Sequence, residues 1–274
     1  MGISHCSLLI ANSSHYSAPL PCATLAIPRI RAGFIVRGSI VWLSERDSPD
    51  AFPPVDRALR EPDGLLAAGG DLSPARLIAA YQRGIFPWYS QGQPILWWCP
   101  DPRAVLFPSE FVTSRSLAKT IRNKGFETKI DSSFTEVIRL CGSTEVRPRG
   151  TWLSPEMQLA YSAMHELGYA HSVETWREGR LVGGLYGVAV GRVFFGESMF
   201  SLERDASKVA LRRLCDELTA RDFHMIDCQM ATSHLLSLGA QLIPRMHFIR
   251  QLAEHATRDD TPGPWYTQSP APMN

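Results

Sequence analysis

A change of hydrophobic period at Ala170 constrains the fold more than any other feature of this chain. From 170 to 200, apolar and polar residues alternate with the period of two that is typical of β-strands. Glu178-Gly179 and Val190-Gly191 interrupt this run, and such pairs favour hairpin turns. The pattern therefore predicts an antiparallel meander of strands at 171–176, 180–190 and 192–200.

A helix and a shorter strand follow this meander. Residues 206–220 repeat their apolar positions with helical spacing, which predicts an amphipathic helix. The run 225–228 has a short strand pattern, and 233–238 is helical again. This succession predicts an α+β fold with a mixed, largely antiparallel sheet, and it is compatible with the N-acetyltransferase-like (GNAT-like) fold.

Helices earlier in the chain carry clear start and stop signals. Ser73 is a good N-cap, Pro74 suits the first helical position, and Gly84 favours a left-handed residue after the helix. The same Ser-Pro start signal recurs at 154–155, and a further helix is predicted near 135–140. These signals predict the helices independently of any tertiary contact.

The same patterns suggest how the chain divides into regions. Residues 1–40 have few charges and no clear period. They are interpreted as a disordered extension, as residues that precede the true start, or as a weak targeting peptide. The regions expected after them are a small N-terminal α/β domain at 41–103, an acetyltransferase-like catalytic domain at 104–258 and a loose tail at 259–274.

Composition excludes several classes of protein. The 28 basic and 27 acidic residues leave a net charge of +1, so any nucleic-acid contact is expected to be local. The six cysteines form no C-x-x-C pair, which argues against a zinc site and against a secreted disulfide framework. No run approaches the roughly 18–20 apolar residues of a membrane span. We therefore expect a cytoplasmic protein with reduced thiols, without membrane contact, without metal or cofactor, and monomeric.

A basic helix is predicted at 114–124. Its four charged residues recur roughly three to four positions apart, so they can share one face: Arg115, Lys119, Arg122 and Lys124. This face is interpreted either as a solvated surface or as a site for the phosphates of a nucleic acid.

Glycines and one carboxylate mark the second and third strands of the meander. Gly183, Gly184, Gly187 and Gly196 indicate either a tightly packed sheet or backbone left open for a substrate. Glu197 lies among aromatic and apolar neighbours, where an isolated charge is costly to bury. Its partner is expected to be a basic side chain of this protein or a cationic substrate, and the residue alone favours the internal partner.

Asp227-Cys228-Gln229 ends the short strand at 225–228. Asp227 and Gln229 are two residues apart, so in an extended chain their side chains point to the same side and can bond each other. An Asp that orients the Gln amide would leave the Gln oxygen as an acceptor for a substrate N–H. The alternative is that Asp227 caps the following turn. Cys228 points away from this pair and is expected to pack inward.

Tryptophans cluster between 88 and 98. Trp97 and Trp98 are expected to form a small aromatic core, whereas Trp88 follows a proline and is equally suited to lining a cleft. The sequence has no G-x-S-x-G elbow and no P-loop. It also lacks the R-x-x-G-x-[GA] run that holds CoA in acetyltransferases. A sheet of that type without a CoA cradle favours another acyl donor.

Several of these motifs together resemble those of the leucyl/phenylalanyl-tRNA–protein transferases. The resemblance covers about 41–252, and its motifs are 64–71, 84–88, 97–103 and 183–229. It implies a small α/β domain before a GNAT-like domain. It also implies the transfer of Leu or Phe, and less well Met, from aminoacyl-tRNA to proteins that begin with Arg or Lys, which marks them for N-end rule degradation.

The same resemblance implies roles for individual residues. Asp227 and Gln229 match the catalytic pair, and Glu197 matches the glutamate that binds the acceptor N-terminus. Trp88 and Trp152 match tryptophans beside the 3′-terminal adenosine of the tRNA. The pocket for the transferred side chain would be Leu185, Phe194, Met199, Leu211, Leu214 and Ile226. Leu185 stands where some members have Met, a change that keeps the volume similar.

Two other functions remain open from the sequence. One is a CoA-dependent N-acyltransferase on the same fold, against which the missing CoA cradle counts. The other is a module that binds tRNA ends or degradation signals without catalysis, in which the Asp227–Gln229 pair would be dispensable. The sequence does not rank Leu, Phe and Met as donors, and it does not name the cellular acceptors.

Overall fold

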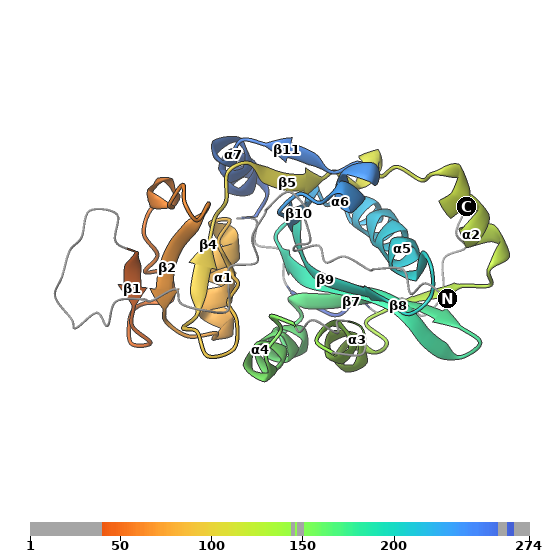
Figure 1. Ribbon diagram of the computed structural model, residues 1–274, viewed down its shortest axis with the longest axis horizontal. Helices are drawn as coiled ribbons and strands as arrows, with labels where there is room; N and C mark the ends of the chain where they lie inside the picture. The colour runs from red at the N-terminus through yellow and green to blue at the C-terminus, as the bar shows by residue number, and fades with distance from the viewer. Residues whose placement is uncertain (1–39, 144–145, 147–150, 257–261, 266–274) are drawn as a thin grey trace.

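The fold contains two β-sheets, and residues 99–102 connect them (Figure 1). The computed structural model describes residues 40–143, 146, 151–256 and 262–265. Most of the predicted extension 1–40 therefore lies outside the described residues. Within them, no helix is both long enough and apolar enough to cross a membrane.

The smaller sheet has four strands in the order β1-β2-β4-β3. β1 pairs with β2 in parallel, and the other pairs are antiparallel. Its strands and the elements between them are β1 (Val41–Leu43), the 3-10 turn Val55–Arg57, β2 (Leu65–Gly69), α1 (Pro74–Gln82), β3 (Phe86–Pro87) and β4 (Leu96–Trp98).

The larger sheet has seven strands in the order β11-β5-β10-β9-β8-β7-β6. Only β9 and β10 pair in parallel. Its strands are β5 (Arg103–Leu106), β6 (Glu127–Ile130), β7 (Ala170–Arg177), β8 (Arg180–Val190), β9 (Val193–Ser201), β10 (Met225–Gln229) and β11 (Gln241–Ile243). The predicted α+β fold with a mixed, largely antiparallel sheet is confirmed by this topology.

Helices cover both faces of the larger sheet (Figure 1). One face packs on α5 (Ala206–Ala220), and the other packs on α3 (Phe134–Cys141) and α4 (Pro155–Glu166). The remaining helical elements are the 3-10 turn Pro108–Glu110, α2 (Arg115–Asn123), α6 (Ser233–Ser237) and α7 (Arg245–His255). Each face has its own buried hydrophobic cluster, one with α5 and one with α1, α3, α4 and α7.

Local signals in the sequence predicted most of these elements. The side chains of Ser73 and Ser154 cap α1 and α4 as expected, and α5 has the predicted bounds. The three-stranded meander is confirmed as β7, β8 and β9. The strands β5, β6 and β11 were not predicted, because segments of three or four residues become strands only by pairing with a neighbour.

The predicted boundary between 103 and 104 stays a prediction, and β5 begins at this point. The expectation of a loose tail needs a correction within 262–265. Trp265 is buried there, and its ring stacks on His171 with 3.9 Å between centroids. Its backbone N–H also donates to Asp131. This part of the tail therefore packs against the larger sheet.

Candidate active site

A buried carboxylate at a bulge in β9 is the centre of the site. Tyr186 of β8 pairs with Ser198, and Gly187 pairs with Gly196, so Glu197 has no residue opposite it. Such bulges redirect a side chain out of the regular alternation. Glu197 is 0% exposed and lies on the face of the sheet that α1 and α4 cover.

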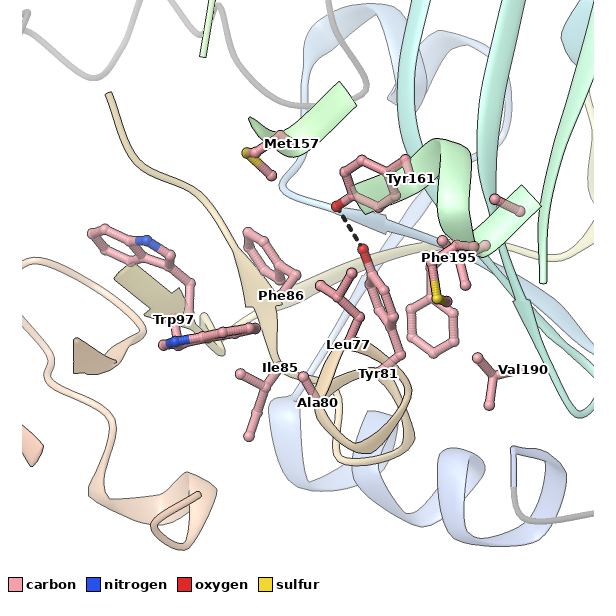
Figure 2. Close-up of a cluster of buried hydrophobic side chains, with 14 of the residues drawn as sticks. Leu77, Ala80, Tyr81, Ile85, Phe86, Trp97, Met157, Tyr161, Val190 and Phe195 are labelled. Atoms are coloured by element: carbon pink, nitrogen blue, oxygen red, sulfur yellow. Dashed lines mark hydrogen bonds between the residues drawn. The ribbon is translucent and has the colours of Figure 1, made fainter. Parts of the chain in front are cut away.

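Two tyrosines from these helices meet Glu197. The Tyr81 hydroxyl of α1 donates to Glu197 Oε1 at 2.8 Å, and the Tyr161 hydroxyl of α4 donates to Oε2 at 2.8 Å. Figure 2 shows the two hydroxyls pointing toward each other, and their oxygens are 2.8 Å apart. The Gln229 side-chain amide donates its Nε2 to Glu197 Oε1 at 3.0 Å. Three neutral donors thus surround the carboxylate, and the expected basic side chain is not among them.

Burial dominates the ionisation of this cluster. Desolvation raises the pKa of Glu197 to about 7, although its tyrosine and glutamine donors oppose that rise. Burial, and then the charge of Glu197, raises the pKa of Tyr81 and Tyr161 well above the ordinary value. Both phenols therefore keep their protons at neutral pH.

Asp227 holds the end of β10 through its contacts with Arg103 of β5. The Arg103 guanidinium donates to both Asp227 oxygens at 2.7 Å, and both side chains are 0% exposed. Asp227 Oδ1 also accepts the backbone N–H of Gln229 at 2.9 Å. Burial lowers the pKa of Arg103, but the charge and hydrogen bonds of Asp227, together with Cys99 and Glu197, raise it above its ordinary value, so the guanidinium stays charged.

The predicted Asp227–Gln229 arrangement needs a correction. Gln229 has φ +62°, and the register of β10 against β5 shifts between the two residues. The chain is therefore not extended there, and Asp227 bonds the Gln229 backbone rather than its amide. Glu197 orients that amide instead. Only the nitrogen of the Gln229 amide can donate to a carboxylate, so the amide oxygen points away from Glu197. This oxygen, Gln229 Oε1, is buried without a partner among the described residues.

The glycines on β8 pack tightly rather than leaving backbone open for a substrate. A Cβ on Gly183 would lie 2.5 Å from Ala206 Cβ at the start of α5. A Cβ on Gly187 would collide with the Phe195 carbonyl and the Phe194 ring. The first of the two sequence interpretations, a tightly packed sheet, therefore holds at these positions.

The six residues of the predicted side-chain pocket lie together in the hydrophobic cluster under α5: Leu185, Phe194, Met199, Leu211, Leu214 and Ile226. Each is 0–1% exposed. Cys228 packs inward in the same cluster, as predicted, and burial raises its pKa well above the ordinary value. This cluster lies on the opposite face of the sheet from Tyr81 and Tyr161. The pairing of β9 with β10 ends at Phe195 and Asp227.

The tryptophans belong to the cluster that contains Tyr81 and Tyr161. Trp97 and Trp98 form the expected aromatic core, with Trp97 Nε1 donating to the Gly69 carbonyl at 2.9 Å. Trp88 is half-buried, 5.5 Å from the Trp98 ring. Trp152 is 8% exposed, and its Nε1 has no partner among the described residues. Trp152 therefore has an unused donor beside the core.

The basic helix lies far from Glu197. α2 packs on α5 and stands at the opposite end of the molecule from the four-stranded sheet (Figure 1). Arg115, Lys119 and Arg122 are exposed on it. Lys124 is half-buried instead, and its ammonium donates to the Arg204 carbonyl and lies over the Phe126 ring. Three of the four predicted charges are therefore available to a partner.

Sequence reasoning missed three residues of this network. Arg103 ends a recognised motif, but its partner is 124 residues away. Tyr81 and Tyr161 lie within two of the predicted helices, but neither was a candidate site residue. A tyrosine on a core-facing position needs a partner for its hydroxyl, and that requirement was the available signal.

The matching family models and the curated relatives agree on one family. The family described as "Leucyl/phenylalanyl-tRNA protein transferase" matches residues 105–253, and the N-terminal domain of the same family matches residues 70–101. A relative from Aromatoleum aromaticum with that name is 56% identical over 235 residues, which is 86% of this chain and 98% of the relative. A second relative, from Azoarcus sp., is 57% identical over 226 residues, 82% of this chain and 95% of its own length.

A solved structure has a more distant likeness. A GCN5-related N-acetyltransferase from Kribbella flavida is 10% identical, with a TM-score of 0.33, covering 63% of this chain and 61% of its own. That likeness is too weak to support an argument by itself. The family match and the two relatives are sufficient. The chain belongs to the leucyl/phenylalanyl-tRNA–protein transferase family and is therefore an aminoacyltransferase.

Proposed function

We propose that this chain moves Leu or Phe, and less well Met, from aminoacyl-tRNA to the α-amino group of proteins that begin with Arg or Lys. The modified proteins would then be marked for N-end rule degradation. The observation that supports this best is Gln229 Oε1, a buried acceptor without a partner among the described residues, held beside the Glu197 carboxyl. An acceptor next to a carboxyl group suits an amine that belongs to a cationic residue.

The reaction needs positioning more than strong acid–base groups. An aminoacyl ester is already activated, so holding the amine against its carbonyl supplies much of the rate enhancement. A free α-amino group has a pKa near ~7.7–8, so a sizeable minority is unprotonated at neutral pH. Gln229 Oε1 would accept the N–H of that amine as it attacks. The amide bond forms, the ester bond breaks, and the 3′-oxygen of the tRNA takes up the proton that the amine loses.

Asp227 contributes by position. Its carboxylate is neutralised by Arg103 and bonds the Gln229 N–H at 2.9 Å, which holds the backbone turn that aims the amide. Asp227 is therefore a positioning residue in this mechanism, together with Arg103. Glu197 completes the support, because its Oε1 accepts Gln229 Nε2 at 3.0 Å.

The substrates would contact the residues around this core. Glu197 would bind the cationic side chain at the acceptor N-terminus. The six apolar residues under α5 would take the Leu or Phe side chain, where each extra methylene in contact contributes roughly 1–3 kcal/mol of discrimination. Trp88 and Trp152 would lie against the 3′-terminal adenosine. The exposed charges of α2 would bind phosphates of the tRNA.

A transfer assay tests this proposal. We expect purified protein, incubated with leucyl-tRNA and a peptide that begins with Arg, to add Leu to the N-terminus of the peptide, as mass spectrometry would show. Addition of CoA should not inhibit transfer. If the peptide stays unmodified while leucyl-tRNA remains intact, the proposed function is wrong. Inhibition by CoA would instead favour the CoA-dependent alternative.

Gln229→Leu tests the mechanism in the same assay. This change keeps the bulk of the side chain and removes both its oxygen and its nitrogen, so we expect kcat to fall at least about 100-fold, with a smaller change in KM. Gln158→Leu is the matched control, because the Gln158 amide donates to the Leu153 carbonyl at 3.3 Å and, among the described residues, not to Glu197. Equal kcat values for the two variants would exclude Gln229 from the reaction.

A further inference from the structure

Two tyrosine hydroxyls and one carboxyl group contact one another in a closed ring inside the site. The Tyr81 hydroxyl lies 2.8 Å from Glu197 Oε1, the Tyr161 hydroxyl lies 2.8 Å from Oε2, and the two hydroxyls lie 2.8 Å from each other. Figure 2 shows this last contact. All three side chains are 0% exposed. Each of the three contacts has the length of a good O–H···O hydrogen bond.

The protons available to this ring can be counted. Each hydrogen bond needs one proton between its two oxygens, and a tyrosine hydroxyl supplies one. An ionised Glu197 supplies none, so three contacts would share two protons, and one contact would bring two lone pairs together at 2.8 Å. A protonated Glu197 supplies the third proton. Each member of the ring can then donate once and accept once.

The charged and titratable groups around Glu197 agree with this count. They are Tyr81 on α1, Tyr161 on α4, Tyr186 on β8, Asp227 on β10 and Arg103 on β5. Arg103 is paired with Asp227 through both oxygens, so the two largely cancel. Within the described part of the chain, no ion pair includes Glu197.

We propose that Glu197 carries a proton in the free enzyme, which closes the ring with Tyr81 and Tyr161, and that binding of a cationic acceptor N-terminus releases this proton. The first half stands on the geometry of the ring, and the second half rests on the proposed function. The proton passes from the Glu197 carboxyl to the buffer. The carboxylate left behind pairs with the guanidinium or ammonium group of the acceptor.

This arrangement has a physical advantage for an enclosed site. A neutral acid avoids an unpaired buried charge while the site is empty, and the charge appears only when a cation is there to pair with it. The affinity for the acceptor should therefore rise with pH as Glu197 loses its proton more easily. Because desolvation raises its pKa to about 7, this rise should occur near neutral pH.

Glu174 on β7 provides a matched contrast. Burial raises the pKa of this carboxyl to about 7 as well. Its oxygens, however, accept from the hydroxyls of Ser132 and Ser172 and from the N–H groups of Ser132 and Ser133, and each donor brings its own proton. The contacts of Glu174 are therefore all satisfied when it is ionised, and the proton count does not require it to be neutral.

Infrared spectroscopy of the free enzyme tests the first half. At pH 6 we expect the carbonyl stretches of protonated carboxylic acids, among them one band that Glu197→Gln removes and Glu174→Gln leaves in place. Tyr161→Phe should shift its frequency, because the hydroxyl in contact with Glu197 Oε2 is gone. Far-UV circular dichroism checks that each variant is folded. If Glu197→Gln removes no acid band, or if the band that it removes also disappears in Glu174→Gln, the inference is overturned.

Calorimetry of acceptor binding tests the second half. A peptide analogue that keeps the arginine guanidinium but lacks the α-amino group is titrated at pH 6.5 in phosphate and in imidazole, whose ionisation enthalpies differ. We expect release of about three quarters of a proton per bound analogue, since roughly this fraction of Glu197 is protonated half a pH unit below a pKa of about 7, and none with Glu197→Gln at concentrations that still give binding. Binding without proton release overturns the inference. Failure of transfer itself would count against the proposed function and leave the infrared result to decide the ring.

Discussion

Arg103 supports the site although it is far in sequence from Asp227, which it contacts. Its guanidinium lies between the rings of Phe86 and Phe248, 4.8 and 4.6 Å from their centroids, and donates to both oxygens of Asp227. Asp227 in turn bonds the Gln229 N–H. At the scale of single residues, the orientation of the Gln229 amide thus depends on Arg103 through the backbone and on Glu197 through the side chain.

Removing Arg103 should destabilise the protein strongly. Arg103→Met leaves Asp227 buried and unpaired, so we expect the free energy of unfolding in urea to fall by about 3–5 kcal/mol. Arg103→Met with Asp227→Asn should recover part of this loss. The control is Arg139→Met, which breaks an exposed pair with Glu136 and should change stability by less than about 1 kcal/mol. Similar losses for the buried and the exposed pair would contradict this account.

At the scale of secondary-structure elements, helices and strands position the site residues close together. α1 and α4 begin at capped Ser-Pro signals and each presents a tyrosine to the same carboxylate. The β9 bulge turns Glu197 toward those helices, and the end of the β9–β10 pairing frees Gln229 to reach it. Each local feature is ordinary alone, and the site results from their combination.

A prediction about the basic helix α2 belongs to the same scale of secondary-structure elements. Lys119 and Arg122 are exposed one turn apart, so Lys119→Glu with Arg122→Glu should repel tRNA phosphates. We expect leucyl-tRNA binding at low salt to weaken at least about 10-fold. The slope of log affinity against log salt concentration should fall by about one unit for each phosphate that the helix no longer neutralises. Filter binding at several salt concentrations measures both quantities.

A charge change elsewhere provides the comparison. Arg250 is exposed on α7, and Arg250→Glu should leave the affinity for leucyl-tRNA within about 2-fold of the parent. If the α2 variant and the Arg250 variant bind leucyl-tRNA equally well, then α2 is a solvated face, as the alternative interpretation holds.

On the scale of the whole molecule, the network joins the two sheets. Tyr81 belongs to α1, which connects strands of the four-stranded sheet, whereas Glu197 and Gln229 belong to the seven-stranded sheet. The Tyr81–Glu197 hydrogen bond spans 116 residues of sequence. Protonation of the buried Glu197 carboxyl should therefore change the free energy of global unfolding.

The pH dependence of stability tests this link. Burial raises the Glu197 pKa from 4.5 to about 7, so the folded state binds more protons than the unfolded state between these values. The resulting contribution to stability is present below pH 4.5 and is lost as pH rises through 7. Glu197→Gln should therefore flatten the fall in unfolding free energy across this window, by up to about 1.4 kcal/mol per pH unit.

Urea denaturation between pH 5 and pH 8 measures this slope. Glu136→Gln is the control, because a hydrogen bond from Arg139 lowers the Glu136 pKa below 4.5 and its contribution is lost only as pH falls further. Identical slopes for the parent and Glu197→Gln would mean that the carboxyl is ionised in the folded state throughout this range.

The sequence alone determined the features that depend on neighbours along the chain. Caps and apolar periods predicted α1, α4, α5 and the meander, because these preferences act within a few residues. The order and spacing of its motifs also led to the family that the comparisons confirm. Glu197, Asp227 and Gln229 were recognised as candidates for the same reason.

Only the tertiary structure decided what those residues contact. The partners of Glu197 come from α1, α4 and β10, and the partner of Asp227 comes from β5. A positive φ at Gln229 breaks the extended conformation, so Asp227 bonds the Gln229 backbone N–H rather than its side-chain amide. Hydrogen bonds between distant segments depend on how sheets and helices pack, and burial then sets how strongly each group holds its proton. Spacing along the chain encodes neither these long-range hydrogen bonds nor the burial of each group.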